Sequence, residues 1–162
     1  MKVVSPYSPN LTLARTHYFY RMEELRCLVD LPGLRVSCDE ANGWLYNQWL
    51  GEHDEASVKY YATSICACLT ARPCIKILSD HTGLVGNWRG ASPWMGREYF
   101  ERLADQGILY FAWVYNAGYH DRVAMEQALY YTTRPVVAMF GELASAYDWL
   151  RSCPPQPWKS HL

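Results

Sequence analysis

The sequence predicts an α/β fold: a mixed sheet in which an N-terminal β-hairpin continues into parallel strands joined by about four helices. Three observations predict it. Short apolar runs of strand length alternate with longer amphipathic segments from residue 54 onward. An Asn-Gly pair separates two alternating segments just before this pattern, as in a hairpin. Proline and glycine stand at the boundaries between segments, where they break regular structure.

The first third of the chain contains the hairpin. Residues 1–32 are predicted to be an N-terminal extension, extended at first and with a short helical turn around Glu23–Arg26. The segments 34–38 and 44–50 are the two strands of the hairpin, and Asn42-Gly43 supplies a two-residue turn between them.

The rest of the predicted domain, which spans residues 33–152, alternates helix and strand. Asp54 and Ser92 are natural N-caps, and Gly107 is a natural helix stop. The segment Ile108–Tyr115 is apolar almost throughout, which is typical of the centre of a parallel sheet. The expected helices are 54–71, 92–105, 120–132 and 142–152, the expected strands are 74–80, 108–115 and 136–140, and residues 153–162 are a loose tail.

Composition excludes several classes of function. The 162 residues fit one domain that buries its own core. The formal net charge is −1 and no basic run exists to neutralise a phosphate backbone, so nucleic acid is excluded as a partner. No apolar run reaches the ~18 residues of a membrane span. The start of the chain lacks the apolar centre of a secretory signal, and we therefore expect a cytoplasmic protein.

The six cysteines predict neither a metal site nor a disulfide framework. Cys66 and Cys68 stand two apart on a predicted helix and so point in different directions. Zinc sites usually need a C-x-x-C pair or a nearby histidine, and neither is present. We expect buried free thiols, no metal and no cofactor.

Three loops are expected at the carboxyl edge of the parallel strands, where open α/β sheets bind ligands. They are residues 80–91, 115–120 and 141. Trp88, Arg89 and Trp94 suggest an aromatic pocket with a cationic anchor. The complete set of candidate ligand- or partner-binding residues is Asp80, His81, Asn87, Trp88, Arg89, Trp94, Tyr115 and Asn116.

Each candidate also has a purely structural interpretation, which the sequence leaves open. Asp80 and His81 suit acid–base chemistry, but Asp80 equally suits the task of binding loop amides. The tryptophans equally suit covering the open end of the sheet. Ser92 is a candidate anion site or phosphosite at a helix start, or a plain N-cap. The loop glycines match no nucleotide-binding pattern, and no catalytic residue is predicted.

The chain resembles the SpoIIAA-like branch of the STAS superfamily, whose fold is shared with the CRAL-TRIO lipid carriers. The segments that carry the resemblance are LYNQWLG at 45–51, ILSDHTGLVGNWRGASPWMG at 77–96, GILYFAWVYNAGYHDRVAMEQ at 107–127 and PVVAMFGELASAYDWL at 135–150. The resemblance implies a regulatory or binding domain. Antagonists of this superfamily are switched by phosphorylation of a serine directly after a strand. Here about a dozen residues separate Ser79 from Ser92, so the chain departs from that pattern.

We therefore expect a cytoplasmic, bacterial, non-catalytic domain that engages a protein partner or a small apolar or anionic ligand at the carboxyl ends of its parallel strands. One alternative is a carrier of a lipid or another apolar ligand, as the CRAL-TRIO side of the resemblance implies. Another is a hydrolase that uses Asp80 and His81. A further alternative is a purely structural homodimer, built by pairing an exposed hairpin edge or an aromatic face, and finding a dimer would exclude none of the others.

Overall fold

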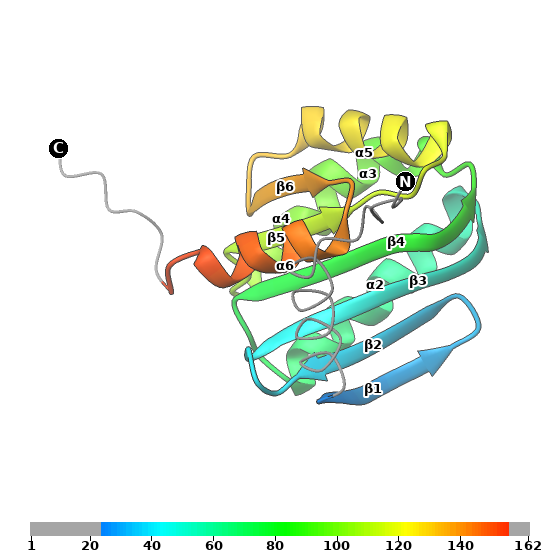
Figure 1. The fold of residues 1–162 in the computed structure, drawn as a ribbon. Coiled ribbons are helices and arrows are strands. Elements are labelled where there is room, and N and C mark those ends of the chain that lie inside the picture. Colours follow the sequence, from blue (N-terminus) through cyan, green and yellow to red (C-terminus); the bar gives the residue numbers. More distant parts are fainter. Residues whose placement is uncertain (1–23, 156–162) are drawn as a thin grey trace, which may run out of the picture.

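The computed structural model describes residues 24–155, which fold around one six-stranded sheet (Figure 1). The strands follow one another across the sheet in the order of the sequence, β1 to β6. The first three pair antiparallel, and β3 to β6 pair parallel. The strands are β1 (Leu25–Leu31), β2 (Leu34–Asp39), β3 (Trp44–His53), β4 (Lys76–Gly86), β5 (Tyr110–Val114) and β6 (Val136–Phe140).

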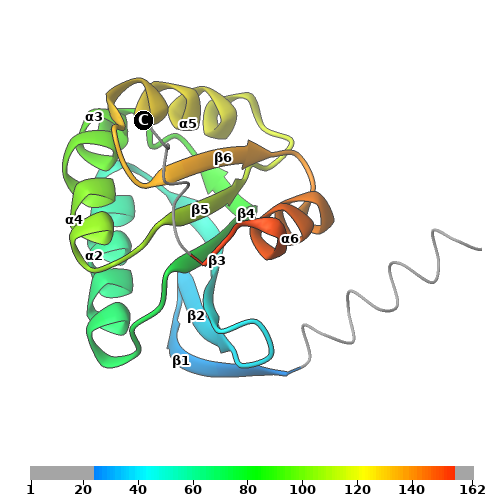
Figure 2. The ribbon, with the colours of Figure 1, turned by 90° about the vertical axis from the view of Figure 1, so that its left-hand side faces the viewer.

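The helices cover the two faces of the sheet unequally. In Figure 2, α2, α3 and α4 lie on one side of the sheet and α6 lies on the other. The helices are α2 (Glu55–Ala71), α3 (Ser92–Trp94), α4 (Phe100–Asp105), α5 (Tyr119–Tyr131) and α6 (Leu143–Ser152). The predicted fold class, a mixed sheet with a hairpin and parallel strands joined by helices, is confirmed.

Two hydrophobic clusters form the core, one on each face. The larger cluster lies under α2, α4 and α5 and includes Trp49, Trp88, Phe100, Phe111 and Trp113. The smaller cluster lies under α6 and includes Trp44, Tyr46, Leu78, Val114 and Leu150. β5 is fully buried along its length, as expected for a strand covered on both faces.

The sheet begins before the predicted domain boundary at residue 33, because β1 pairs with β2. The predicted helical turn around Glu23–Arg26 is wrong where the structure describes it: Leu25 and Arg26 belong to β1. The remainder of the predicted extension and residues 156–162 of the predicted tail lie outside the described residues. At the start of that tail, Cys153 is buried and its carbonyl oxygen accepts a hydrogen bond from Lys76 Nζ at 2.8 Å.

The hairpin between β2 and β3 is confirmed, but its turn is longer than predicted. Asp39 pairs with Trp44, so four residues connect the strands. Gly43 has a positive φ of 71°. Among the described residues only glycines have a positive φ, so Asn42 does not. The Asn42 amide group instead donates to the Asp39 carboxylate at 2.7 Å, which is a local bond typical of asparagine in turns.

Asp54 caps α2 as the sequence predicts. Its carboxylate accepts a hydrogen bond from the Ser57 amide at 2.9 Å, and the Ser57 hydroxyl accepts one from the Asp54 amide at 3.0 Å. These reciprocal bonds satisfy two amides that a helix start leaves without partners. The Ser57 amide bond also lowers the pKa of Asp54.

The segment from Arg89 to Asp105 is almost continuously helical, and it begins before the predicted start at residue 92. A 3-10 turn (Arg89–Ala91) leads into α3, and a π-helical turn (Met95–Tyr99) joins α3 to α4. Gly107, with a φ of 105°, follows the end of α4, as predicted. No helix among the described residues is both long and apolar enough to cross a membrane.

All six cysteines are within the described residues and form no disulfide, and four of them are buried. Cys27 is exposed and Cys74 is half-buried, so the expectation of buried thiols is wrong for Cys27.

His53 is buried at the end of β3, where its neutral form is favoured. Its Nε2 lies 3.0 Å from the carbonyl oxygens of Gly33 and Leu50, and its Nδ1 lies 3.1 Å from the Ser57 hydroxyl. Burial lowers the pKa of His53, because the imidazolium would lose its hydration.

This histidine makes the protein less stable in mild acid. The unfolded chain takes up a proton below about pH 6.5 that the folded chain resists, so the stabilisation is complete above that pH and decreases as the pH falls towards the lowered pKa. Urea unfolding at about pH 7.5 and about pH 5 should show this decrease, and His53→Gln should reduce it. The exposed His120→Gln serves as the control. An unchanged pH dependence in His53→Gln would contradict the assignment.

Candidate functional site

The three predicted loops do lie at the carboxyl edge of the parallel strands. They follow β4, β5 and β6, which pair side by side. The Asn116 amide group donates to the Leu84 carbonyl oxygen at 2.6 Å and so ties the second loop to β4. However, β4 continues six residues beyond the predicted end at Asp80, because Gly51, Glu52 and His53 of β3 pair with it there.

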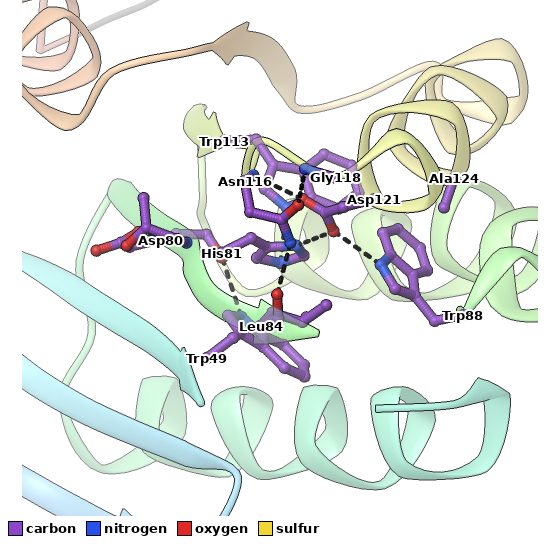
Figure 3. Close-up of polar contacts among 12 residues, drawn as sticks. Trp49, Asp80, His81, Leu84, Trp88, Trp113, Asn116, Gly118, Asp121 and Ala124 are labelled. Carbon is purple, nitrogen blue, oxygen red and sulfur yellow. Dashed lines mark hydrogen bonds and ion pairs between the residues drawn. The ribbon is translucent and has the colours of Figure 1, made fainter. Parts of the chain in front are cut away.

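A buried polar network joins the strands to α5 beneath this edge (Figure 3). Asp121 Oδ1 accepts hydrogen bonds from His81 Nδ1 at 2.7 Å and from Trp88 Nε1 at 2.9 Å. Its other oxygen accepts from the Asn116 backbone amide at 3.1 Å. On the far side of the imidazole, Trp113 Nε1 lies 3.0 Å from His81 Nε2. The His81, Trp88, Trp113 and Asp121 side chains are called here the His–Asp network.

The bonding pattern fixes the protons of the network. An indole nitrogen only donates, so Trp113 requires His81 Nε2 to be an unprotonated acceptor. His81 is therefore neutral, with its proton on Nδ1, and Asp121 is the acceptor of all three donors. Burial acts to raise the pKa of Asp121, but the hydrogen bonds from His81, Trp88 and Asn116 outweigh it and lower that pKa.

The His–Asp network is not accessible for acid–base catalysis. A histidine base needs one free ring nitrogen facing a nucleophile or substrate, and both nitrogens of His81 are occupied by protein groups. His81 is also 1% exposed and Asp121 is 1% exposed, so a substrate reaches neither. The residue types of an acid–base pair are present here, but in a structural role.

Asp80 lies on the opposite face of the sheet from His81, since neighbouring residues of a strand point in opposite directions. Its carboxylate accepts from the Tyr46 hydroxyl at 2.7 Å and from the Thr82 amide at 2.9 Å. The alternative of a hydrolase in which Asp80 and His81 act together is therefore wrong. Asp80 thus binds a neighbouring backbone amide, as one interpretation expected, but the amide is that of Thr82 in β4 and not one in a loop.

The candidate residues thus do not form one exposed rim. His81 and Trp88 are buried in the network, and Trp88 has no exposed surface at all. Trp94 is half-buried, and its ring stacks on Tyr99 with the centroids 6.0 Å apart. Tyr115 and Asn116 are also half-buried, while Asn87 and Arg89 are exposed.

Ser92 differs from both of its predicted roles. It lies inside the helical segment, and its side chain makes no capping bond. Its hydroxyl donates instead to the Ala124 carbonyl oxygen of α5 at 2.8 Å, and the residue has no exposed surface. In this conformation neither a kinase nor an anion reaches the hydroxyl. The N-cap prediction fails because a 3-10 turn already precedes Ser92, so the helix start lies further upstream.

A pocket of about 250 Å³ lies beside Arg89, between the start of α3 and the second half of α5. Its lining residues are Arg89, Gly90, Pro93, Gln127, Tyr130 and Tyr131. Tyr130 is 84% exposed, and the Arg97 guanidinium lies 4.2 Å from the centre of the Tyr131 ring. Sequence reasoning missed both tyrosines. The signal was the adjacent Tyr-Tyr pair, since only one of two neighbouring helical residues can face the core.

No group of three or more histidine, cysteine, aspartate or glutamate residues within residues 24–155 has a geometry that would hold a metal ion. The glycines of the first loop serve packing. A side-chain carbon at Gly86 would lie 2.3 Å from the His53 carbonyl oxygen, and Gly86 has a φ of 103°. The close approach of Gly86 to β3 therefore requires a residue without a side chain at this position.

Comparison with known proteins matches neither a family model nor a curated protein. Similar solved structures include the following two. One is the anti-sigma factor antagonist SpoIIAA in its unphosphorylated form, with a TM-score of 0.47 and 10% sequence identity over 80% of this chain and 98% of that one. The other is an uncharacterized DUF3478 protein with a SpoIIAA-like fold from Shewanella loihica PV-4, with a TM-score of 0.49 and 19% identity over 75% of this chain and 97% of that one. Both are similarities of fold at low sequence identity.

Proposed function

We propose that this chain is a non-catalytic regulatory domain that binds a protein partner through Asn87, Arg89 and the tyrosine-lined pocket beside them. The observation that carries the proposal is the way the His–Asp network and Ser92 hold the segment around Arg89. Tyr115 and Asn116, at the same edge of the sheet, belong to the proposed surface, and His81 and Trp88 support it from beneath.

The segment that presents Arg89 is anchored on both sides. Before it, Trp88 Nε1 donates to Asp121, and after it, the Ser92 hydroxyl donates to the Ala124 carbonyl oxygen. Both acceptors belong to α5. The Asn87 side chain also accepts a hydrogen bond from the Arg89 amide at 3.1 Å. A surface fixed in this way loses little conformational entropy when a partner binds.

The exposed groups are those that protein interfaces favour. Within residues 24–155, the Arg89 guanidinium forms no ion pair, whereas Arg122 and Arg134 are paired with carboxylates. Arginine and tyrosine are enriched at the residues that dominate binding energies. A partner segment with a carboxylate next to an aromatic or apolar side chain suits a free guanidinium beside two tyrosines.

The test is partner capture by Arg89→Ala. The tagged protein is used to isolate partners from extracts of its own cells, and the affinity of each purified partner is then measured by calorimetry. We expect the substitution to weaken binding about tenfold or more and to leave the free energy of unfolding within about 0.5 kcal/mol. The matched control is Arg35→Ala, an exposed arginine on β2. Equal affinities for Arg89→Ala, Tyr130→Ala and the control would contradict the proposal.

We also propose that the protein works in the cytoplasm, since six cysteines without a disulfide are typical of a reducing compartment. A homodimer is a further proposal, and β1, an edge strand in the described sheet, offers it a pairing edge.

A further inference from the structure

A second hollow lies between the edge strand β1 and helix α2, and it shares no lining residue with the pocket beside Arg89. It measures about 520 Å³, which is within the usual range of small-molecule sites. It is called here the β1–α2 groove. It exists because β1 extends the sheet beyond the area that α2 covers, and because the facing residues of α2 are small. Those residues, Ser64, Ala67, Cys68 and Ala71, follow the i, i+3, i+4, i+7 spacing of one helical face.

The walls of the groove are apolar over most of its length. β1 contributes Leu28, Val29 and Leu31, which are each only partly buried. Ala67 and Ala71 on the facing helix are exposed. Ser64 supplies the one hydroxyl among the lining side chains. The lining side chains offer a peptide few partners for its backbone amides and carbonyls, whereas a hydrocarbon chain needs none.

The charged groups gather at one end of the groove. Arg26 of β1 and Arg72 at the end of α2 both line it. Both bind the same carboxylate: Arg26 Nε lies 2.9 Å from Glu40 Oε1, and Arg72 Nη2 lies 2.5 Å from Glu40 Oε2. Two guanidinium groups thus share one carboxylate, and each has further N–H donors for a second one. A second carboxylate there would receive the paired hydrogen bonds that arginine gives to such groups.

We propose that the β1–α2 groove binds a long-chain fatty acid. The hydrocarbon chain lies between Leu28, Leu31 and Ala67, and the carboxylate binds Arg26 and Arg72. This inference goes beyond the proposed function, because it concerns another surface and another class of ligand. It also places the apolar-ligand alternative beside β1 and α2, and not at the loops that follow β4, β5 and β6.

Binding is measured on the full chain with two probes of equal length, palmitate and hexadecanol. Each probe displaces the fluorescent fatty acid cis-parinarate, and native mass spectrometry gives the number of molecules bound. We expect one palmitate per chain. The double variant Arg26→Gln/Arg72→Gln should bind palmitate about tenfold more weakly, since it loses charge-assisted bonds, and should bind hexadecanol nearly as well as the natural protein does.

A second variant tests the walls. Ala67→Trp fills the groove from an exposed helical position and should weaken the binding of both probes at least tenfold. Ala56→Trp, the same change on the exposed first turn of α2, should leave both affinities unchanged. Circular dichroism shows whether each variant is folded. If Ala67→Trp is not folded, the arginine double variant still tests the inference.

Three results would overturn the inference: no palmitate bound by the natural protein, equal affinities in Ala67→Trp and Ala56→Trp, or no loss of palmitate affinity in the arginine variant. Arg89→Ala should keep full palmitate binding. A failure of the partner-capture experiment and a failure of fatty-acid binding are therefore separate outcomes.

Discussion

Replacement of Asp121 by alanine is expected to lower the free energy of unfolding by about 3–5 kcal/mol, because it leaves several hydrogen-bond donors without an acceptor, at a cost of about 1–3 kcal/mol each. The change leaves three donors without an acceptor: the buried His81 Nδ1 and Trp88 Nε1, and the part-buried Asn116 amide. Water cannot replace the carboxylate without entering a region where Trp88 and Trp113 have no exposed surface. The loss is large because one carboxylate serves groups from β4, the loop after it, and the loop before α5.

Urea unfolding of Asp121→Ala against the natural protein measures this loss. Asp148→Ala, an exposed aspartate on α6, should stay within about 0.5 kcal/mol. Asp121→Asn should fall between the two, since the amide keeps one acceptor oxygen but adds a donor to a site that already holds three. If Asp121→Ala were as stable as Asp148→Ala, the His–Asp network would not hold the edge together.

The same network shows why the sequence misplaced the site. Polar residues after an apolar strand were expected to be exposed, and this placed Asp80, His81 and Trp88 on a rim. The pairing of β4 with the end of β3 is a long-range contact that carries the strand on to Gly86. His81 therefore points into the core, and its partner Asp121 stands 40 positions away in the sequence. Nothing in a single sequence links the two.

Replacement of Gly96 by alanine is expected to have the second largest effect, a loss of about 2 kcal/mol in the free energy of unfolding. Gly96 lies in the π-helical turn, whose backbone packs directly against α5. A side-chain carbon there would lie 2.3 Å from the Ala128 carbonyl oxygen and 2.7 Å from Tyr131 Cβ. The first of these is a backbone atom, so α5 itself must move. Alanine gains up to about 1 kcal/mol in helix propensity, which is less than the cost of that movement.

Thermal and urea unfolding of Gly96→Ala would measure the loss. Gly141→Ala is the matched control, since its new carbon meets the end of the Tyr115 side chain at 3.0 Å, which is able to move. We expect that control within about 0.5 kcal/mol of the natural protein. Because Tyr131 also lines the pocket beside Arg89, Gly96→Ala should weaken partner capture as well. Full stability in Gly96→Ala would show that the two helices separate at little cost.

The fold was predictable because its signals are local. The Asp54 cap, the stop at Gly107 and the apolar run of β5 each act within a few residues, and each is confirmed. Details that depend on side-chain partners were not predictable. Asn42 binds Asp39 and the Tyr147 hydroxyl at 2.8 Å, so the hairpin adopts a longer turn than the Asn-Gly pair indicates. The Ser92 hydroxyl likewise binds the Ala124 carbonyl oxygen of α5 and does not cap its own helix.

The smaller core cluster depends on a single cover. Within residues 24–155, α6 alone lies over Trp44, Leu78 and Val114, and Lys76 fastens its end by donating to the Leu150 and Cys153 carbonyl oxygens at 2.7 and 2.8 Å. Release of this helix would bare one side of the sheet and leave the packing of the other side intact. We therefore expect α6 to unfold as a separate cooperative unit, at a lower cost in free energy than global unfolding.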